Sequence, residues 1–273
     1  MKNIVKFIVF SFVISLFWSC EDVVNVDLDT STPKLVIDAT IKWQKGTPGN
    51  LQMIKLSTTS SFYQSQINAA SNAIVTITNS ATTYNFIETA GTGEYICTNF
   101  NPVLNQNYTL TVIYQGQTYT STDKLYETPT INSVEQSLFP GLGENNIQIK
   151  FFYQDNGAEE NSYLISFKNS TALLPEYGIV EDTFFQGNQM FGLYVSDKLK
   201  PTNVLFMSLQ AVPKRYANYM TKLLNIAGST GGSPFSTAPA TLRGNIINQT
   251  NPDDFPLGYF NLSEIDSKSY TIQ

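Results

Sequence analysis

Few side chains in this 273-residue chain are suited to catalysis, because the sequence contains no histidine. Histidine is the commonest general base and a frequent metal ligand, so its absence excludes Ser-His and Cys-His catalytic pairs. Adjacent carboxylate pairs remain for acid–base chemistry at Glu159-Glu160, Glu181-Asp182 and Asp253-Asp254. A glycosidase needs two carboxyl groups about 5 to 9 Å apart across a cleft. We interpret the pairs as solvated loop charges and keep a secreted carboxylate-dependent hydrolase as an alternative.

Other catalytic motifs are weak or missing. Ser121 and Lys124 match the Ser-x-x-Lys spacing of serine acyl-enzymes, but that chemistry needs a helical turn and these residues end a strand-like segment. The sequence has no glycine-rich phosphate loop, nucleophile elbow, cysteine cluster or spaced Asp-x-Asp-x-Asp-Gly calcium loop. Calcium binding by the acidic loops stays open. We therefore expect a protein that is not an enzyme and that has no cofactor or metal site.

Cys20 is the residue with the clearest chemistry. Lys2 and Lys6 come before an apolar run from Phe7 to Trp18, and Ser19 and Cys20 follow it directly. This order is typical of a lipoprotein signal peptide, which would cover residues 1–19 and leave Cys20 as the acylated end of the mature chain. An uncleaved anchor helix is the alternative, and the run falls short of the roughly 20 residues that span a bilayer.

The mature chain is acidic. Removing residues 1–19 takes away two of the 16 basic residues, so that 14 basic residues face 22 acidic ones, a net charge of −8. Such a surface repels phosphate backbones, so nucleic acid is not an expected partner. Residues 20–32 form an acidic tether that begins with Glu21 and Asp22, which is either a solvated spacer or an export signal. Cys97 then has no intramolecular partner, and we interpret it as a small core residue rather than a reactive thiol.

The segments that must position these residues are patterned for β-structure. In residues 35–41 the odd positions are apolar while Asp38 and Thr40 face the other way, which predicts a half-buried strand. Similar patterns occupy residues 51–57, 73–77, 83–88, 95–98, 108–114, 117–124, 131–137, 146–153, 162–168, 190–195, 203–212, 257–262 and 269–272. Short strands separated by turn signals predict an all-β protein, with an immunoglobulin-like N-terminal sandwich over residues 33–128 and a β-rich domain over residues 129–273.

One segment departs from this pattern. Residues 213–227 carry apolar side chains at helical spacing, with Pro213 at the first helical position and Gly228 at the C-terminal cap. The spacing predicts a single helix over about residues 213–227 in the second domain, packed by one face against a sheet.

Aromatic residues are abundant, with 15 Tyr, 18 Phe and 2 Trp. Exposed rings stack on sugars, so one interpretation is a ligand-binding face, with Trp43, Tyr63 and Tyr177 as the candidate contacts. The interpretation that we favour is that most rings pack in the core and across strands.

Several short stretches together resemble one known family. At the start of the mature chain they are Cys20 to Leu28 and Pro33 to Ile41, followed by Asn72 to Thr78, Gly93 to Tyr95 and Tyr108 to Val112. The closing stretches are Gly231 to Phe235, Arg243 to Ile246 and Leu257 to Phe260. Over essentially the whole mature chain, this set resembles the Bacteroidota surface lipoproteins of the domain of unknown function 4249 family.

The resemblance implies a location and a role. It implies an outer-membrane, lipid-anchored protein at the cell surface, with Glu21 and Asp22 matching the acidic export signal of such lipoproteins. It also implies an accessory role beside a TonB-dependent receptor in nutrient uptake, with an unknown small-molecule, peptide or glycan ligand. No catalytic residue comes with the resemblance. An adhesin or structural spacer module is the remaining alternative.

The closing stretches contain five residues that we interpret as structural. Gly244 and Gly258 are expected to allow tight backbone turns, and Tyr259 and Phe260 are expected to pack. Asn245 directly follows Gly244 in the Gly-Asn-Ile stretch.

Overall fold

Alternating burial along the chain produces most of the strands that the sequence predicts. The computed structural model describes residues 32–60, 67–138, 146–183, 186–228 and 242–273. In the first strand, buried and more exposed side chains alternate from Leu35 onward. The first half of the described chain contains β1 (Leu35–Gln44), β2 (Gln52–Thr58), β3 (Asn68–Ala69), β4 (Ile74–Asn79), β5 (Thr82–Thr89), β6 (Glu94–Cys97), β7 (Asn107–Tyr114) and β8 (Gln117–Tyr126).

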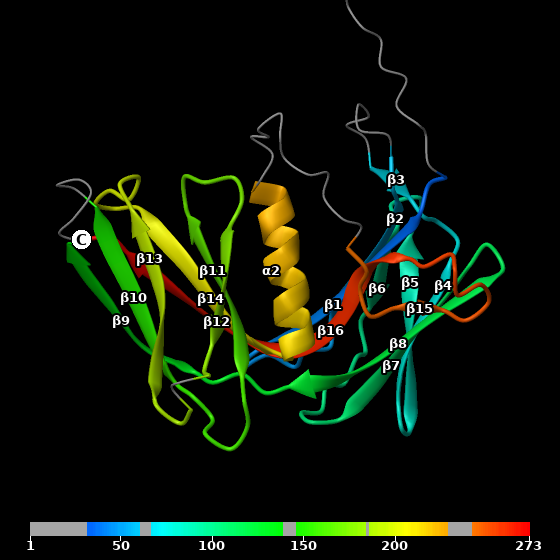
Figure 1. Ribbon diagram of the computed structural model, residues 1–273, viewed down its shortest axis with the longest axis horizontal. Helices are drawn as coiled ribbons and strands as arrows, with labels where there is room; N and C mark the ends of the chain where they lie inside the picture. Colours follow the sequence, from blue (N-terminus) through cyan, green and yellow to red (C-terminus); the bar gives the residue numbers. More distant parts are fainter. Residues whose placement is uncertain (1–31, 61–66, 139–145, 184–185, 229–241) are drawn as a thin grey trace, which may run out of the picture. The chain divides into compact units, whose positions relative to one another are not determined.

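The second half adds strands and a helix (Figure 1). They are β9 (Ile131–Leu138), β10 (Ile147–Gln154), β11 (Ser162–Asn169), β12 (Glu176–Glu181), β13 (Gln189–Ser196), β14 (Val204–Val212), α2 (Lys214–Gly228), β15 (Ile247–Asn248) and β16 (Leu257–Thr271). The prediction of an all-β protein with one helix is confirmed for the residues that the structure describes. The strands β3, β12 and β15 were not predicted.

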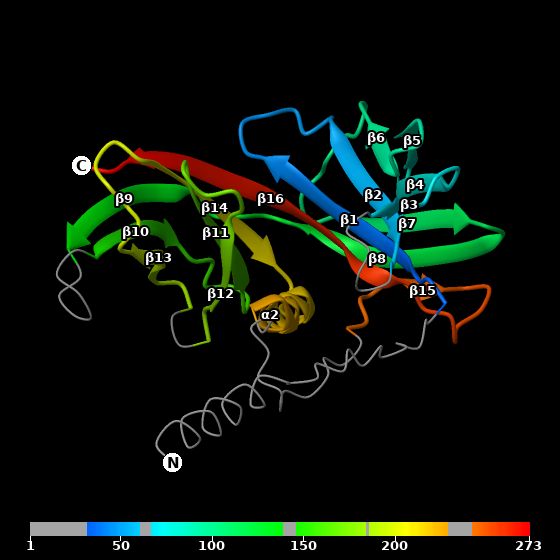
Figure 2. The ribbon, with the colours of Figure 1, turned by 90° about the horizontal axis from the view of Figure 1, so that it is seen from above.

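The last strand corrects the sequence analysis, which predicts two closing strands over residues 257–262 and 269–272. β16 is one strand of 15 residues, drawn in red in Figure 2, that runs from beside β1 to beside β14. It pairs in parallel with β1 from Val36↔Leu257 to Gln44↔Ile265. It then pairs antiparallel with β14 from Leu209↔Asp266 to Val204↔Thr271. The prediction failed because residues 263–268 are mostly polar and resemble a connection.

The pairings of β16 also close the sheet formed by β1, β2 and β4–β8, which we call the first-half sheet. The strand order runs β12-β11-β14-β16-β1-β2-β6-β5-β4-β7-β8-β15. In addition, β16 pairs in parallel with β8 at Leu262↔Leu125. The path from β16 through β1 and β8 therefore returns to β16. A separate sheet has the order β13-β10-β9.

Two apolar cores fill these sheets. The first takes side chains from β1, β2 and β4–β8, and also Ile246, Phe260 and Leu262 from the end of the chain. The second takes side chains from β9–β11, β13 and β14, with Ile272. Cys97 is buried in the first core, as expected. Residues from beyond the predicted boundary at Thr128 thus complete the first core, and the division into domains over residues 33–128 and 129–273 stays a prediction.

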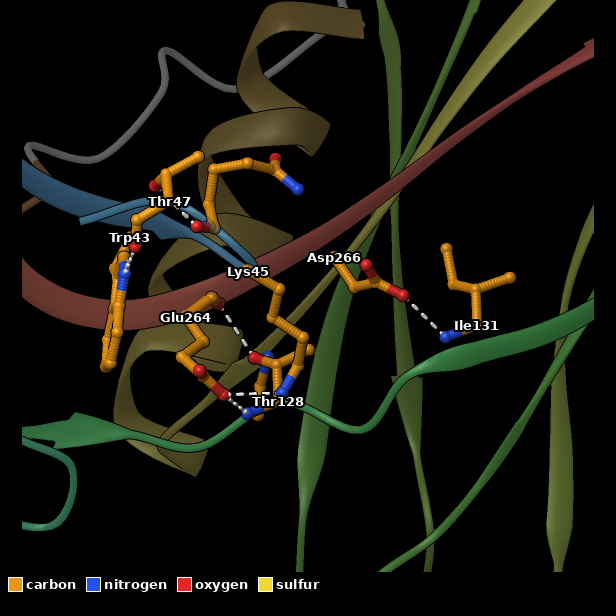
Figure 3. A network of polar contacts seen from close by, with 9 residues as sticks. Trp43, Lys45, Thr47, Thr128, Ile131, Glu264 and Asp266 are labelled. Carbon is orange, nitrogen blue, oxygen red and sulfur yellow. Dashed lines mark hydrogen bonds and ion pairs between the residues drawn. The ribbon is translucent and has the colours of Figure 1, made fainter. Parts of the chain in front are cut away.

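A polar network fixes the connection between β8 and β9 to β16 (Figure 3). The Glu264 side chain, 7% exposed, accepts hydrogen bonds from Lys45 Nζ at 2.7 Å and from the Thr128 backbone N–H at 3.2 Å. The Thr128 hydroxyl donates to the Glu264 carbonyl oxygen at 2.7 Å. Asp266 Oδ2 accepts from the Ile131 backbone N–H at 2.6 Å. The two acids therefore give buried backbone groups of the connection their partners.

The helix α2 begins and ends within one residue of its predicted bounds. The Pro213 carbonyl oxygen accepts from the backbone N–H groups of Tyr216 at 2.8 Å and Ala217 at 3.0 Å, which starts the helix. Tyr216 and Ala217 pack with Leu164 of β11, Val212 of β14 and Tyr259 of β16 in a third apolar cluster. Packing of this face places α2 beside β11 and β12 (Figure 1).

Candidate groove between α2 and strand β1

A groove of about 960 Å³ lies between α2 and the outward sides of β1 and β2. We call it the α2 groove. Its helix wall is apolar and aromatic and includes Tyr216, Tyr219, Met220 and Leu223. Tyr177 of β12 and Tyr259 of β16 also line it. Concave sites with mostly apolar walls and a few polar groups are the usual form of ligand sites.

Strand β1 supplies a polar wall. Because side chains alternate along a strand, Ile37 and its odd-numbered neighbours enter the first core, and the even-numbered residues face the groove. Asp38 and Lys42 are exposed there, and neither forms an ion pair within the described residues. The Asp38 carboxylate accepts a hydrogen bond from the Thr40 hydroxyl at 3.0 Å. Both charges are therefore available to a ligand.

Tyrosines gather opposite Asp38. The ring of Tyr259 lies 4.8 Å from that of Tyr216 and 4.8 Å from that of Tyr219, between ring centroids. Tyr177 is 41% exposed. Burial, and after it the negative charge of Asp38, raises the pKa of Tyr177, Tyr216 and Tyr219. Asp38 and these three tyrosines line the same groove.

The pKa of Tyr216 makes a prediction about alkaline stability. Burial raises this pKa to about 12, against 10.0 for a free phenol. Between pH 10 and pH 12 the folded protein keeps the phenol proton of Tyr216, whereas the unfolded chain loses it. The contribution of this burial to the free energy of unfolding is therefore fully present below pH 10 and is lost as the pH rises toward 12. Between pH 9 and pH 11.5, urea unfolding should show a loss of unfolding free energy that is smaller in Tyr216→Phe than in the unchanged protein by up to about 2 kcal/mol. An equal loss in both proteins would contradict this.

The start of β16 approaches β1 so closely that only glycine fits. Gly258 has a φ of +95°, and a Cβ atom there would lie 2.0 Å from the Ile37 carbonyl oxygen. A Cβ atom on Gly244 would lie 1.7 Å from the Gly258 carbonyl oxygen. Gly258 lies within β16 and not in the turn that the sequence analysis expects. The two glycines allow three backbone segments to stack beside the groove.

Asn245 holds the backbone of Phe260 in β16. Its Nδ2 donates to the Phe260 carbonyl oxygen at 2.8 Å, and its Oδ1 accepts from the Phe260 N–H at 2.9 Å. Phe260 is buried in the first core, whereas Tyr259 points to the opposite side and packs with the tyrosines of α2. Both residues pack, as expected.

An ion pair holds the N-terminal end of α2. Arg215 Nη2 lies 2.5 Å from Asp123 Oδ1 of β8, whose side chain is fully buried. Burial raises the pKa of Asp123, and the charge of Arg215 opposes that effect without cancelling it. The Lys124 backbone N–H also donates to Asp123 Oδ1, at 2.8 Å. This contact ties the helix to the first-half sheet beside the groove.

The structure places the candidate residues Tyr177 and Trp43 in different surroundings. Tyr177 lines the α2 groove. Trp43 packs half-buried against the first core, and its Nε1 donates to the Thr47 carbonyl oxygen at 2.8 Å (Figure 3), so it does not line the groove. Tyr63, Cys20, Glu21 and Asp22 lie outside the described residues.

The carboxylate pairs take part in separate local contacts. Glu159 and Glu160 form ion pairs with Lys124 and Lys214, each at 3.8 Å. Asp182 is buried and accepts from the Asn161 N–H at 2.7 Å, and Asp254 pairs with Lys34 at 3.5 Å. Asp38 is the only carboxylate among the described residues that line the groove.

Other candidate chemistry is local as well. Ser121 and Lys124 both lie on β8, and the Ser121 hydroxyl donates to the Asn245 carbonyl oxygen at 3.0 Å. In the part of the chain that the structure describes, no three His, Cys, Asp or Glu side chains gather in a way that could hold a metal ion. Among the same residues, no helix is both long and apolar enough to cross a membrane.

Sequence reasoning missed Asp38, Lys42 and the exposed face of α2 as parts of one site. The signal for the first two was their place on the outward side of a strand whose other side is fully apolar. The signal for the helix was an apolar surface wider than one face, since Leu223 is still 38% exposed after packing.

The fold and the groove define an all-β protein with a candidate binding site at its one described helix. The family model described as "Domain of unknown function (DUF4249)" matches residues 21–269. The chain belongs to this family. No curated protein is a significant match.

Solved structures give weak likenesses. A chain of a cytokine receptor complex has 8% identity and a TM-score of 0.27, with 87% of this chain and 96% of that chain covered. A two-domain fibronectin type III segment of chicken tenascin has 13% identity and a TM-score of 0.22, covering 66% and 91%. The FN1–FN3 domains of chicken CNTN1 have 11% identity and a TM-score of 0.28, covering 64% and 62%. Likenesses at this level indicate neither a shared ligand nor a shared partner.

Proposed function

We propose that this protein is a lipid-anchored binding protein of the outer membrane that assists a TonB-dependent receptor in nutrient uptake and is not an enzyme. The observation that carries the binding role is the α2 groove, which has apolar and aromatic walls and two charged side chains, Asp38 and Lys42, that form no ion pair with another described residue. Such composition suits recognition of a ligand by burial, with a few polar groups that set its orientation.

The lipid anchor is supported by the N-terminal sequence. Cys20 follows a short apolar run, and Glu21 and Asp22 come directly after it, as in surface-exported lipoproteins. Each methylene group buried in a membrane contributes about 0.8 kcal/mol, so two or more acyl chains give stable attachment. A protein held at the membrane surface can meet a receptor by diffusion in two dimensions, which favours a weak but frequent contact.

A pull-down from native outer membranes tests the proposal. The tagged full-length protein is extracted in mild detergent and its co-purifying proteins are identified by mass spectrometry. We expect a TonB-dependent receptor in the eluate. The variant Cys20→Ser, which cannot be acylated, should leave the membrane fraction and lose the receptor. Recovery of the anchored protein alone would contradict the partnership, and an unmodified Met1 terminus would contradict the anchor.

A further inference from the structure

We infer that the α2 groove binds a short apolar peptide, with the peptide's amino terminus at Asp38 and its carboxylate at Lys42. This inference rests on the binding role proposed above and names the class of ligand. It comes from the two charges of β1, which have no ion-pair partner in the described part of the chain, and from the tyrosines that line the same groove.

The Asp38 end has the chemistry of an ammonium site. Asp38 is the only carboxylate among the described lining residues, and Tyr177, Tyr216 and Tyr219 line the same groove. An ammonium group donates three hydrogen bonds, which a carboxylate and phenol oxygens can accept. Tyrosine rings also attract a cation to their faces. In the described structure, the only hydrogen bond that Asp38 accepts through its side chain comes from Thr40.

The Lys42 end suits a carboxylate at a defined distance. Lys42 lies four residues after Asp38 on the same side of β1. At a rise of about 3.3 Å per residue, the two positions are about 13 Å apart. An extended peptide has the same rise, so the charged termini of three to five residues can reach both groups. A free amino acid is too short for both contacts.

The walls between the charges favour apolar peptide side chains. Tyr219, Met220 and Leu223 of α2 face the groove, and Met53 of β2 remains 49% exposed at its rim. Removing such apolar surface from water stabilises a complex. A fatty acid has no cation for Asp38, and a neutral sugar has no charged group for either residue. An apolar peptide with free ends matches all three parts of the groove.

Binding of the tetrapeptide Leu-Val-Phe-Leu to the full-length protein in mild detergent tests this inference by isothermal titration calorimetry. Acetylating the peptide's amino terminus, or the substitution Asp38→Asn, should each weaken binding about tenfold. Amidating its carboxylate, or Lys42→Met, should do the same. Asp38→Asn should add no further loss for the acetylated peptide, and Lys42→Met none for the amidated one.

Two controls separate the outcomes. Asp197→Asn and Lys198→Met change an exposed acid and base that do not line the groove, and they should leave the affinity unchanged. The blocked peptides test the same contacts without altering the protein, so a folding defect in a variant does not decide the result. Absence of binding, or equal affinity for the peptide blocked at both ends, would overturn the inference. Receptor recovery without peptide binding would sink this inference alone, and peptide binding without receptor recovery would sink only the partnership.

Discussion

Gly258→Ala is expected to destabilise the protein by about 4 kcal/mol, because two costs add. Gly258 has a φ of +95°, which residues with a Cβ atom rarely adopt, and the added atom would meet the Ile37 carbonyl oxygen at 2.0 Å. That oxygen belongs to the backbone of β1, so it cannot rotate away as a side chain does. β1 and β16 would have to separate where they enter the first core. Thermal unfolding should show a midpoint lowered by about 10 °C.

Gly116→Ala is the matched control for this substitution. Gly116 has a φ of +76° in the turn between β7 and β8, and a Cβ atom there would meet nothing within 4 Å. This variant carries the conformational cost alone, which we expect to be about 1 kcal/mol. If both variants lose the same stability, the close approach of β16 to β1 has no energetic importance.

Glu264→Ala is expected to cost about 3 kcal/mol of unfolding free energy. The substitution removes the acceptor of the buried Thr128 N–H and leaves the Lys45 ammonium without its partner. Glu264→Gln keeps an oxygen for Thr128 and should cost less. Chemical denaturation of both variants, of Lys45→Met alone, and of Lys45→Met combined with each gives the coupling energy of the pair.

The exposed pair Lys55–Glu94 serves as the comparison. Its atoms lie 3.3 Å apart, with side chains 43% and 37% exposed. Solvent screens such a pair, so Glu94→Ala should cost less than about 1 kcal/mol. Equal losses for Glu264→Ala and Glu94→Ala would show that the network between β8 and β9 does not hold the connection.

Local patterns predicted the strands and the helix because those signals are local. In β1 the period of two is explicit, and in α2 the apolar spacing is explicit, so their bounds were predicted to within a few residues. The continuity of β16 was not predictable, because its polar middle is stabilised by partners far away in sequence, such as Lys45 and Thr128. The closure of the first sheet by β16 and β8 was hidden for the same reason.

The candidate site was predictable only in part. The ring of Tyr177 predicts a ligand contact and does line the groove, but the ring of Trp43 predicts the same and packs against the first core. An aromatic side chain carries the same sequence signal in both settings. Asp38 was noticed as the outward residue of a strand. Its role in the candidate site depends on the tyrosines of β12 and α2 that line the same groove. These tyrosines lie about 140 to 180 residues away in the sequence, and only the tertiary fold brings them near.

The long strand β16 has a consequence for the time course of synthesis. Leu257 meets Val36, a residue made about 220 residues earlier, and long-range pairings of this kind form late. Until β16 has been synthesised, β1 and β8 present open edges that attract other chains. A truncation that removes β16 would therefore destabilise the first half as severely as the second. Chaperones that shield nascent chains should bind this protein until β16 has been made.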